Sequence, residues 1–151
     1  MYTVFTNNNG AIEFFKQRPE LDCTVKWVGA PAMEVLKTAR GLVQQGAALA
    51  SNPLVGIDVP AQKATPRLTN NPASLLMRRS VIVNPYLTVI TTTQPGGTVD
   101  FKSLKKMNEA VTAYKKNAKL RFIAHNDDTI AHFQAVDLRE MLQALSVLYQ
   151  S

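Results

Sequence analysis

The sequence predicts an α/β fold of three layers, in which helices cover both faces of a mostly parallel sheet. The chain begins with alternating strand-like and helix-like segments, an order that is typical of parallel strands joined by right-handed crossovers. The last strand-like segment of this series is apolar throughout, as in strands that are buried on both faces. At 151 residues the chain has the length of one domain, so we expect a single α/β domain over residues 1–151.

The first three segments are predicted from their residue types and from the residues that end them. Residues 2–6 are β-branched or aromatic and are followed by asparagine and glycine, which indicates a strand. Residues 11–18 have the spacing of a short helix, which Pro19 closes. Residues 22–28 alternate between apolar and polar side chains, and this pattern favours an edge strand with one covered face.

The next two segments complete an initial βαβαβ unit. Residues 31–45 carry an apolar stripe at helical spacing, with proline at the first position and Gly46 as the stop signal. Residues 47–50 are wholly apolar and predict the buried third strand. If the edge-like strand 22–28 is outermost, the strand order is 2-1-3.

The remainder of the core is predicted to contain further strands and a long helix. Residues 60–79 contain prolines and no clear period, so we expect a long loop or an insertion. Strand-like segments follow at 79–83 and 87–92. A helix with an apolar stripe is predicted from Asp100, as its N-cap, to residue 117.

The C-terminal extension, residues 120–151, is expected to pack on this core. Its apolar pieces at 120–124 and 130–136 predict extra strands joined by a tight loop. Asp137, with Glu140 three residues later, matches the capping box that begins many helices. We therefore expect a C-terminal helix that starts at Asp137.

Two asparagine-containing tracts, each directly after a predicted strand, supply the candidate ligand-binding residues. In the order 2-1-3, the first and third strands are neighbours, and their tracts meet at a topological switch point, where open α/β sheets bind ligands. The candidates are Thr6, Asn7, Asn8, Ser51, Asn52, Pro53, Gly56 and Asp58. Their hydroxyl and amide groups suit a small polar or anionic ligand. The alternative is that the asparagines only cap the first helix and turn the chain.

A family resemblance rests on the same tracts. Thr6-Asn7-Asn8 after a first strand, Gly46 with residues 51–56, Thr65-Pro66 and the strand at residues 80–83 resemble the GrdX family. These are small proteins encoded beside glycine reductase and related amino-acid reductase components in anaerobic bacteria. The resemblance covers residues 1–116, although the family usually has histidine where Asn52 stands and a shorter segment before the next strand.

The resemblance implies an accessory role in an amino-acid reductase system and identifies no catalytic residues. It adds a reductase subunit as an expected partner to the small anionic ligand that the polar tracts predict, with either one held at the crevice between the first and third strands. A second copy of the chain, in a homodimer, is a further expected partner. No cofactor and no metal ion are expected.

A basic segment supports an alternative function, the binding of nucleic acid. The chain carries a net charge of +6, and one segment holds seven of its 17 basic residues against Glu109. These seven are Lys102, Lys105, Lys106, Lys115, Lys116, Lys119 and Arg121. Such a patch attracts polyanions, whereas the alternative is a solvated helix face.

The sequence also bears on enzyme classes and location. It contains no phosphate-binding loop, spaced-glycine dinucleotide fingerprint, nucleophile-elbow serine or paired-cysteine zinc motif. A hydrolase or transferase that uses Asp58 with Ser51 stays open, without a visible base for the serine. His125 and His132 flank two aspartates, as in a metal site or an ordinary turn. No apolar run reaches the ~18 residues of a membrane span, and the N-terminal residues lack the basic residue and the small-residue cleavage site of a signal peptide, so we expect a cytoplasmic protein.

Overall fold

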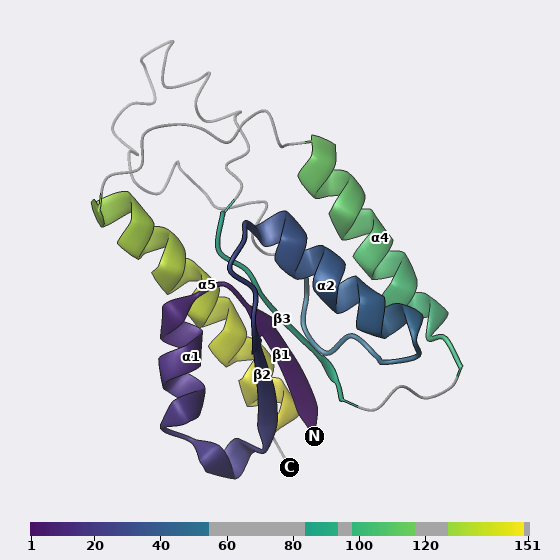
Figure 1. Cartoon of the computed structure of the whole chain (residues 1–151), viewed down its shortest axis with the longest axis horizontal. Helices are drawn as coiled ribbons and strands as arrows, with labels where there is room; N and C mark the ends of the chain where they lie inside the picture. Colours follow the sequence, from purple (N-terminus) through teal and green to yellow (C-terminus); the bar gives the residue numbers. More distant parts are fainter. Residues whose placement is uncertain (55–83, 94–97, 117–126, 150–151) are drawn as a thin grey trace.

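Three strands form one mixed sheet in the order β2-β1-β3, as Figure 1 shows. The computed structural model describes residues 1–54, 84–93, 98–116 and 127–149. In it, β1 (Tyr2–Thr6) pairs in parallel with β2 (Cys23–Trp27) and antiparallel with β3 (Thr88–Thr92). The register of the antiparallel pair sets Thr6 opposite Thr88.

The two faces of the sheet are covered by different helices, which gives the predicted three layers (Figure 1). The described residues form α1 (Asn9–Lys16), α2 (Ala32–Gln44), α4 (Phe101–Lys116) and α5 (Asp127–Leu148), and a short 3-10 helix at Pro19–Leu21. On one face, α2 and α4 pack over Phe5 and Val89, and on the other α1 and α5 pack over Val4 and Ile90. Adjacent residues such as Val4 and Phe5 enter opposite cores because side chains alternate along a strand.

The α/β class, the strand order 2-1-3 and most of the element boundaries are therefore confirmed. Each strand and helix expected at 2–6, 11–18, 22–28, 31–45, 87–92 and 100–117 is found within two residues at either end. The largest shift is in α1, which begins at Asn9 because the buried side chain of Asn8 caps it.

The strand that occupies the third position is not the expected one. Residues 47–50 form only an isolated bridge, Leu49 with Thr91, along the edge of β3 that faces away from β1. Two hydrogen bonds hold this segment there, from Ala50 N to Ile90 O at 2.7 Å and from Thr92 N to Ala48 O at 2.8 Å. β3 thus enters between β1 and residues 47–50, and it runs antiparallel to β1, so the sheet is mixed rather than mostly parallel.

The C-terminal part differs from the expected pair of strands. Residues 130–136 belong to α5, and Asp137 lies well inside that helix rather than at its start. Phe133, Val136, Met141 and Leu145 are buried at helical spacing. A short apolar run such as 130–136 fits both a strand and a buried helix turn, and the helix is found here. The expected strands at 79–83 and 120–124 and the loop at 60–79 lie outside the described residues.

Two large apolar residues of the helices lie at the surface. Phe101, the first residue of α4, is 77% exposed, and Leu142 of α5 is 44% exposed. The buried face of α4 begins instead with Ser103 and continues through Met107, Val111 and Tyr114. Among the described helices, none has both the length and the apolar composition that are needed to cross a membrane.

Candidate ligand-binding site

The Asn7 side chain joins three backbone segments at the end of β1. Its Nδ2 group donates hydrogen bonds to the carbonyl oxygens of Ala30 and Pro85, both at 2.8 Å. Its Oδ1 atom accepts a hydrogen bond from the backbone N–H of Leu87 at 2.9 Å. Both N–H groups of the amide are therefore used within the protein, and the residue fixes the entry of β3 beside β1.

The Asn8 side chain is also held within the fold. It is completely buried, and its Oδ1 atom accepts from the N–H of Gly10 at 3.0 Å as the cap of α1. Its Nδ2 group donates to Gln134 O at 3.1 Å and to Asp137 Oδ2 at 3.0 Å, both on α5. This amide ties the start of α1 to the middle of α5.

Asp137 is the centre of a buried polar network, with 3% of its surface exposed. Its carboxylate accepts three hydrogen bonds, from Asn8 Nδ2, from Thr88 N at 2.9 Å and from Thr88 Oγ1 at 2.7 Å. Because the Thr88 hydroxyl gives its one hydrogen to Asp137, Thr6 Oγ1 is the donor in the 2.9 Å bond between the two threonines. Burial raises the pKa of Asp137, while the bonds from Asn8 and Thr88 lower it.

A cavity of about 460 Å³ lies on the far side of β3 from β1, at the edge of the sheet where the two helix layers meet. Residues 49–52, Thr88, α4 and α5 supply its described lining. The lining residues are Leu49, Ala50, Ser51, Asn52, Thr88, Lys106, Glu140, Met141, Gln143, Ala144 and Val147. A volume of this size lies within the roughly 300–1,000 Å³ range of small-molecule sites.

The second asparagine tract forms one wall of this cavity. Ser51 Oγ accepts a hydrogen bond from the N–H of Ile90 at 2.9 Å, which anchors the tract to β3. Asn52 is exposed, and its Oδ1 atom accepts from the N–H of Leu54 at 3.0 Å. This Asx-type turn uses the side-chain oxygen and holds Asn52 at the rim of the cavity.

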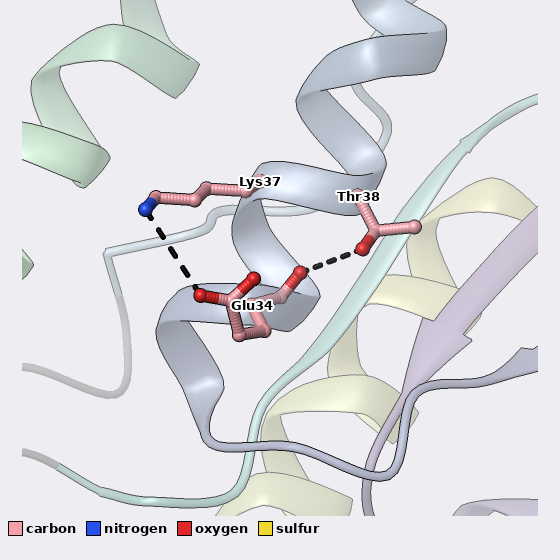
Figure 2. A network of polar contacts seen from close by, with 3 residues as sticks. All are labelled: Glu34, Lys37 and Thr38. Carbon is pink, nitrogen blue, oxygen red and sulfur yellow. Dashed lines mark hydrogen bonds and ion pairs between the residues drawn. The ribbon is translucent and has the colours of Figure 1, made fainter.

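Lys106 of α4 and Glu140 of α5 bring opposite charges to the same cavity without pairing with each other. The ion pairs found in the described part of the chain are Lys16 with Glu13 at 3.8 Å and Lys37 with Glu34 at 4.0 Å. Figure 2 shows the second of these on α2, a surface pair of the kind that contributes little to stability. In the same view, Thr38 Oγ1 donates to the carbonyl oxygen of Glu34 at 2.7 Å.

The structure therefore separates the two tracts that the sequence pattern placed in one crevice. Asn7 and Asn8 bond to the protein itself, and β3 lies between them and Asn52. Of the other candidates, Thr6 and Pro53 are buried, whereas Gly56 and Asp58 lie outside the described residues.

The basic patch is only partly described. Lys102, Lys105, Lys106, Lys115 and Lys116 are exposed on α4, while Lys119 and Arg121 lie outside the described residues. Of the histidines, His132 lies on the exposed surface of α5 and His125 is outside the described part. In the described ranges, no three His, Cys, Asp or Glu residues gather in a way that could hold a metal ion.

Sequence reasoning missed Thr88, Glu140 and Gln143 as lining residues and assigned Lys106 to a basic surface only. Glu140 carried a signal, but its spacing from Asp137 suggested a helix cap. Comparisons of the chain with models of protein families, with curated proteins and with solved structures find no match.

Proposed function

We propose that this protein binds a small polar ligand in the cavity between residues 49–52 and α5. The observation that supports this proposal is that hydroxyl, amide, ammonium and carboxylate groups from residues 49–52, Thr88, α4 and α5 line one cavity of about 460 Å³. Small-molecule sites combine an apolar lining with a few polar groups that orient the ligand. Here Leu49, Met141 and Val147 supply apolar surface, and the polar groups stand among them.

Binding fits this lining better than catalysis does. The Ser51 hydroxyl receives its described hydrogen bond from a backbone N–H, which does not activate the oxygen as a nucleophile. Thr88 is only 6% exposed, and its hydroxyl donates its hydrogen to the buried carboxylate of Asp137. A hydrolase or transferase that uses Asp58 with Ser51 stays an alternative function.

The resemblance to the GrdX family leads us to propose an accessory role beside an amino-acid reductase. In that role the cavity would hold a small ligand of the system, and a reductase subunit would contact the surface around it. A pull-down with reductase components, using the wild-type chain and the Asn52→Ala variant, distinguishes a subunit that occupies the cavity from a subunit that contacts only the surface around it. If the subunit itself occupies the cavity, the variant loses the partner, whereas a ligand site leaves capture of the partner unchanged.

The experiment for the proposed function is a heteronuclear NMR titration of the whole chain with a panel of small carboxylates, amines and amino acids. We expect amide shifts of residues 49–52 and of α5 around Gln143, and a loss of at least about tenfold in affinity on Asn52→Ala. Asn9→Ala is the matched control, because Asn9 is exposed and is not among the residues that line the cavity. A panel that shifts no amide of the cavity contradicts the proposal.

A second candidate function is nucleic-acid binding through α4. Its support is the group of exposed lysines on one helix, which gives a positive field for phosphates. Against it, Glu109 lies four residues after Lys105 and seven before Lys116, so a carboxylate interrupts the stripe. Gel-shift assays at low and physiological salt test this function, which requires an affinity that falls steeply as salt rises.

A further inference from the structure

We propose that the ligand is a small zwitterion, such as an amino acid, whose ammonium group faces Glu140 and whose carboxylate faces Lys106. This inference rests on the proposed function and narrows its ligand class. It depends on the charges that line the cavity and on their sources in the fold.

The two charges come from elements on opposite faces of the sheet. Lys106 lies on α4, which packs with α2 on one face, and Glu140 lies on α5, which packs with α1 on the other. Both side chains line the cavity at the edge of the sheet that residues 49–52 form. No ion pair within 4.0 Å joins them, so each charge stays available to a ligand between the two helices.

Charge complementarity disfavours the simpler ligands. A plain anion that contacts Lys106 is repelled by the nearby carboxylate of Glu140, and a plain cation at Glu140 is repelled by Lys106. A molecule with both charges gains from both contacts. The expectation of a small polar or anionic ligand rested on the asparagine tracts, and Glu140 narrows it to a polar ligand that also carries a positive charge.

The neutral polar groups of the lining suit either end of such a ligand. Gln143 lies on α5 one helical turn after Glu140, and Asn52 stands on the opposing segment. Both amides can donate and accept hydrogen bonds, so they tolerate either end of a zwitterion without adding charge. The apolar residues Leu49 and Val147 complete the lining and favour a ligand with a short hydrocarbon part.

The test uses the whole chain and NMR titrations with three kinds of probe. The zwitterions are glycine, β-alanine, 4-aminobutyrate and 5-aminovalerate, and the single-charge probes are butyrate and butylammonium. We expect one zwitterion to shift the amides of Ser51, Asn52 and Gln143 and to bind at least about tenfold more tightly than either single-charge probe, the effect of one hydrogen bond to a charged group.

Two substitutions give a crossed result that a merely structural role cannot produce. Glu140→Gln should weaken the zwitterion about tenfold and strengthen butyrate, whereas Lys106→Gln should weaken the zwitterion and strengthen butylammonium. The matched controls are Glu20→Gln, on the exposed 3-10 helix, and Lys105→Gln, the neighbouring lysine that lines a different hollow of α4. Both controls should bind every probe like the wild type.

The outcomes separate the two proposals. If butyrate binds the cavity as tightly as every zwitterion and Glu140→Gln only raises affinities, the zwitterion inference is overturned while the small-ligand function stands. If no probe shifts the amides of the cavity at millimolar concentration, both are overturned. Equal weakening of all probes by both substitutions also overturns the inference, because it indicates structural damage rather than charge recognition.

Discussion

The hydroxyl of Thr88 donates a 2.7 Å hydrogen bond to the carboxylate of Asp137, which joins the first residue of β3 to the middle of α5. The backbone N–H of Thr88 donates to the same carboxylate at 2.9 Å, so a single residue makes two of its three bonds. Thr88 also lines the candidate cavity. The network beneath Thr88 thus holds α5, and with it Glu140 and Gln143, in place against residues 49–52.

Replacing Thr88 with valine tests this role of the hydroxyl. Thr88→Val keeps the shape and the backbone bond but leaves Asp137 and Thr6 each without one partner in a buried site. We expect a loss of about 1–3 kcal/mol in the free energy of unfolding, measured by urea denaturation. Thr112→Val, at an exposed position of α4, is the control and should lie within about 0.5 kcal/mol of the wild type.

Asp137 makes the stability depend on pH. Burial raises the pKa of Asp137 above its ordinary 3.8, so the folded protein keeps this proton at pH values where the unfolded chain has lost it. The contribution of Asp137 is therefore fully present below pH 3.8 and is lost as the pH rises through the folded-state pKa. As the pH rises through this window, the unfolding free energy of the wild type should fall relative to that of Asp137→Asn, because the variant lacks this titrating group.

A direct NMR titration of the Asp137 side-chain carboxyl carbon checks the same point without a substitution. We expect its midpoint above 3.8 in the folded protein. A midpoint below that value shows that the hydrogen bonds from Asn8 and Thr88 outweigh burial, and the sign of the pH dependence then reverses.

Alanine substitution should destabilise the protein strongly at Asn7 and hardly at all at Asn52. Asn7→Ala removes the partners of two carbonyls and one N–H, each of which costs roughly 1–3 kcal/mol when left unpaired and buried, so we expect a loss of about 3 kcal/mol in stability. Asn52→Ala, at an exposed position, should change stability by less than about 0.5 kcal/mol. Thermal and urea unfolding of both variants measure this contrast, and equal losses would show that the two tracts have the same structural role.

Tyr114 offers a stabilising substitution. Its hydroxyl is buried on α4 with no hydrogen-bond partner among the residues that the structure describes, and burial raises its pKa above the ordinary value of 10.0. Tyr114→Phe removes an unpaired polar group, so we expect the free energy of unfolding to rise by about 1 kcal/mol. Tyr149→Phe is the contrasting variant, because the Tyr149 hydroxyl donates to the carbonyl oxygen of Leu21, and it should not stabilise the protein.

Local patterns were sufficient to predict the elements but not their neighbours in the sheet. The alternation around Val25 and the helical stripe around Leu36 identify elements from a few adjacent residues. The insertion of β3 beside β1 depends on contacts between residues such as Thr6 and Thr88, which are 82 positions apart. No short-range pattern specifies such a pairing.

The candidate site was predicted in part for the same reason. Ser51 and Asn52 were identified because turn residues after a strand indicate the end of a sheet, and this end does line a cavity. Asp137 was assigned as a helix cap because Asp followed by Glu at the third position fits that motif, whereas burial and long-range bonds give it another role. Lys106 and Glu140 lie on different helices, and only the packing of α4 and α5 around the sheet edge brings them to one cavity.

The most direct test of the proposed function is a crystal structure of the whole chain grown with the tightest-binding small molecule of the titration panel. Our account predicts electron density for that molecule between Asn52 and Gln143, with the amides of Asn7 and Asn8 still bonded to the protein. Density beside Asn7 and Asn8, with their bonds to Ala30 and Asp137 broken, or an empty cavity with the molecule bound elsewhere, would contradict it.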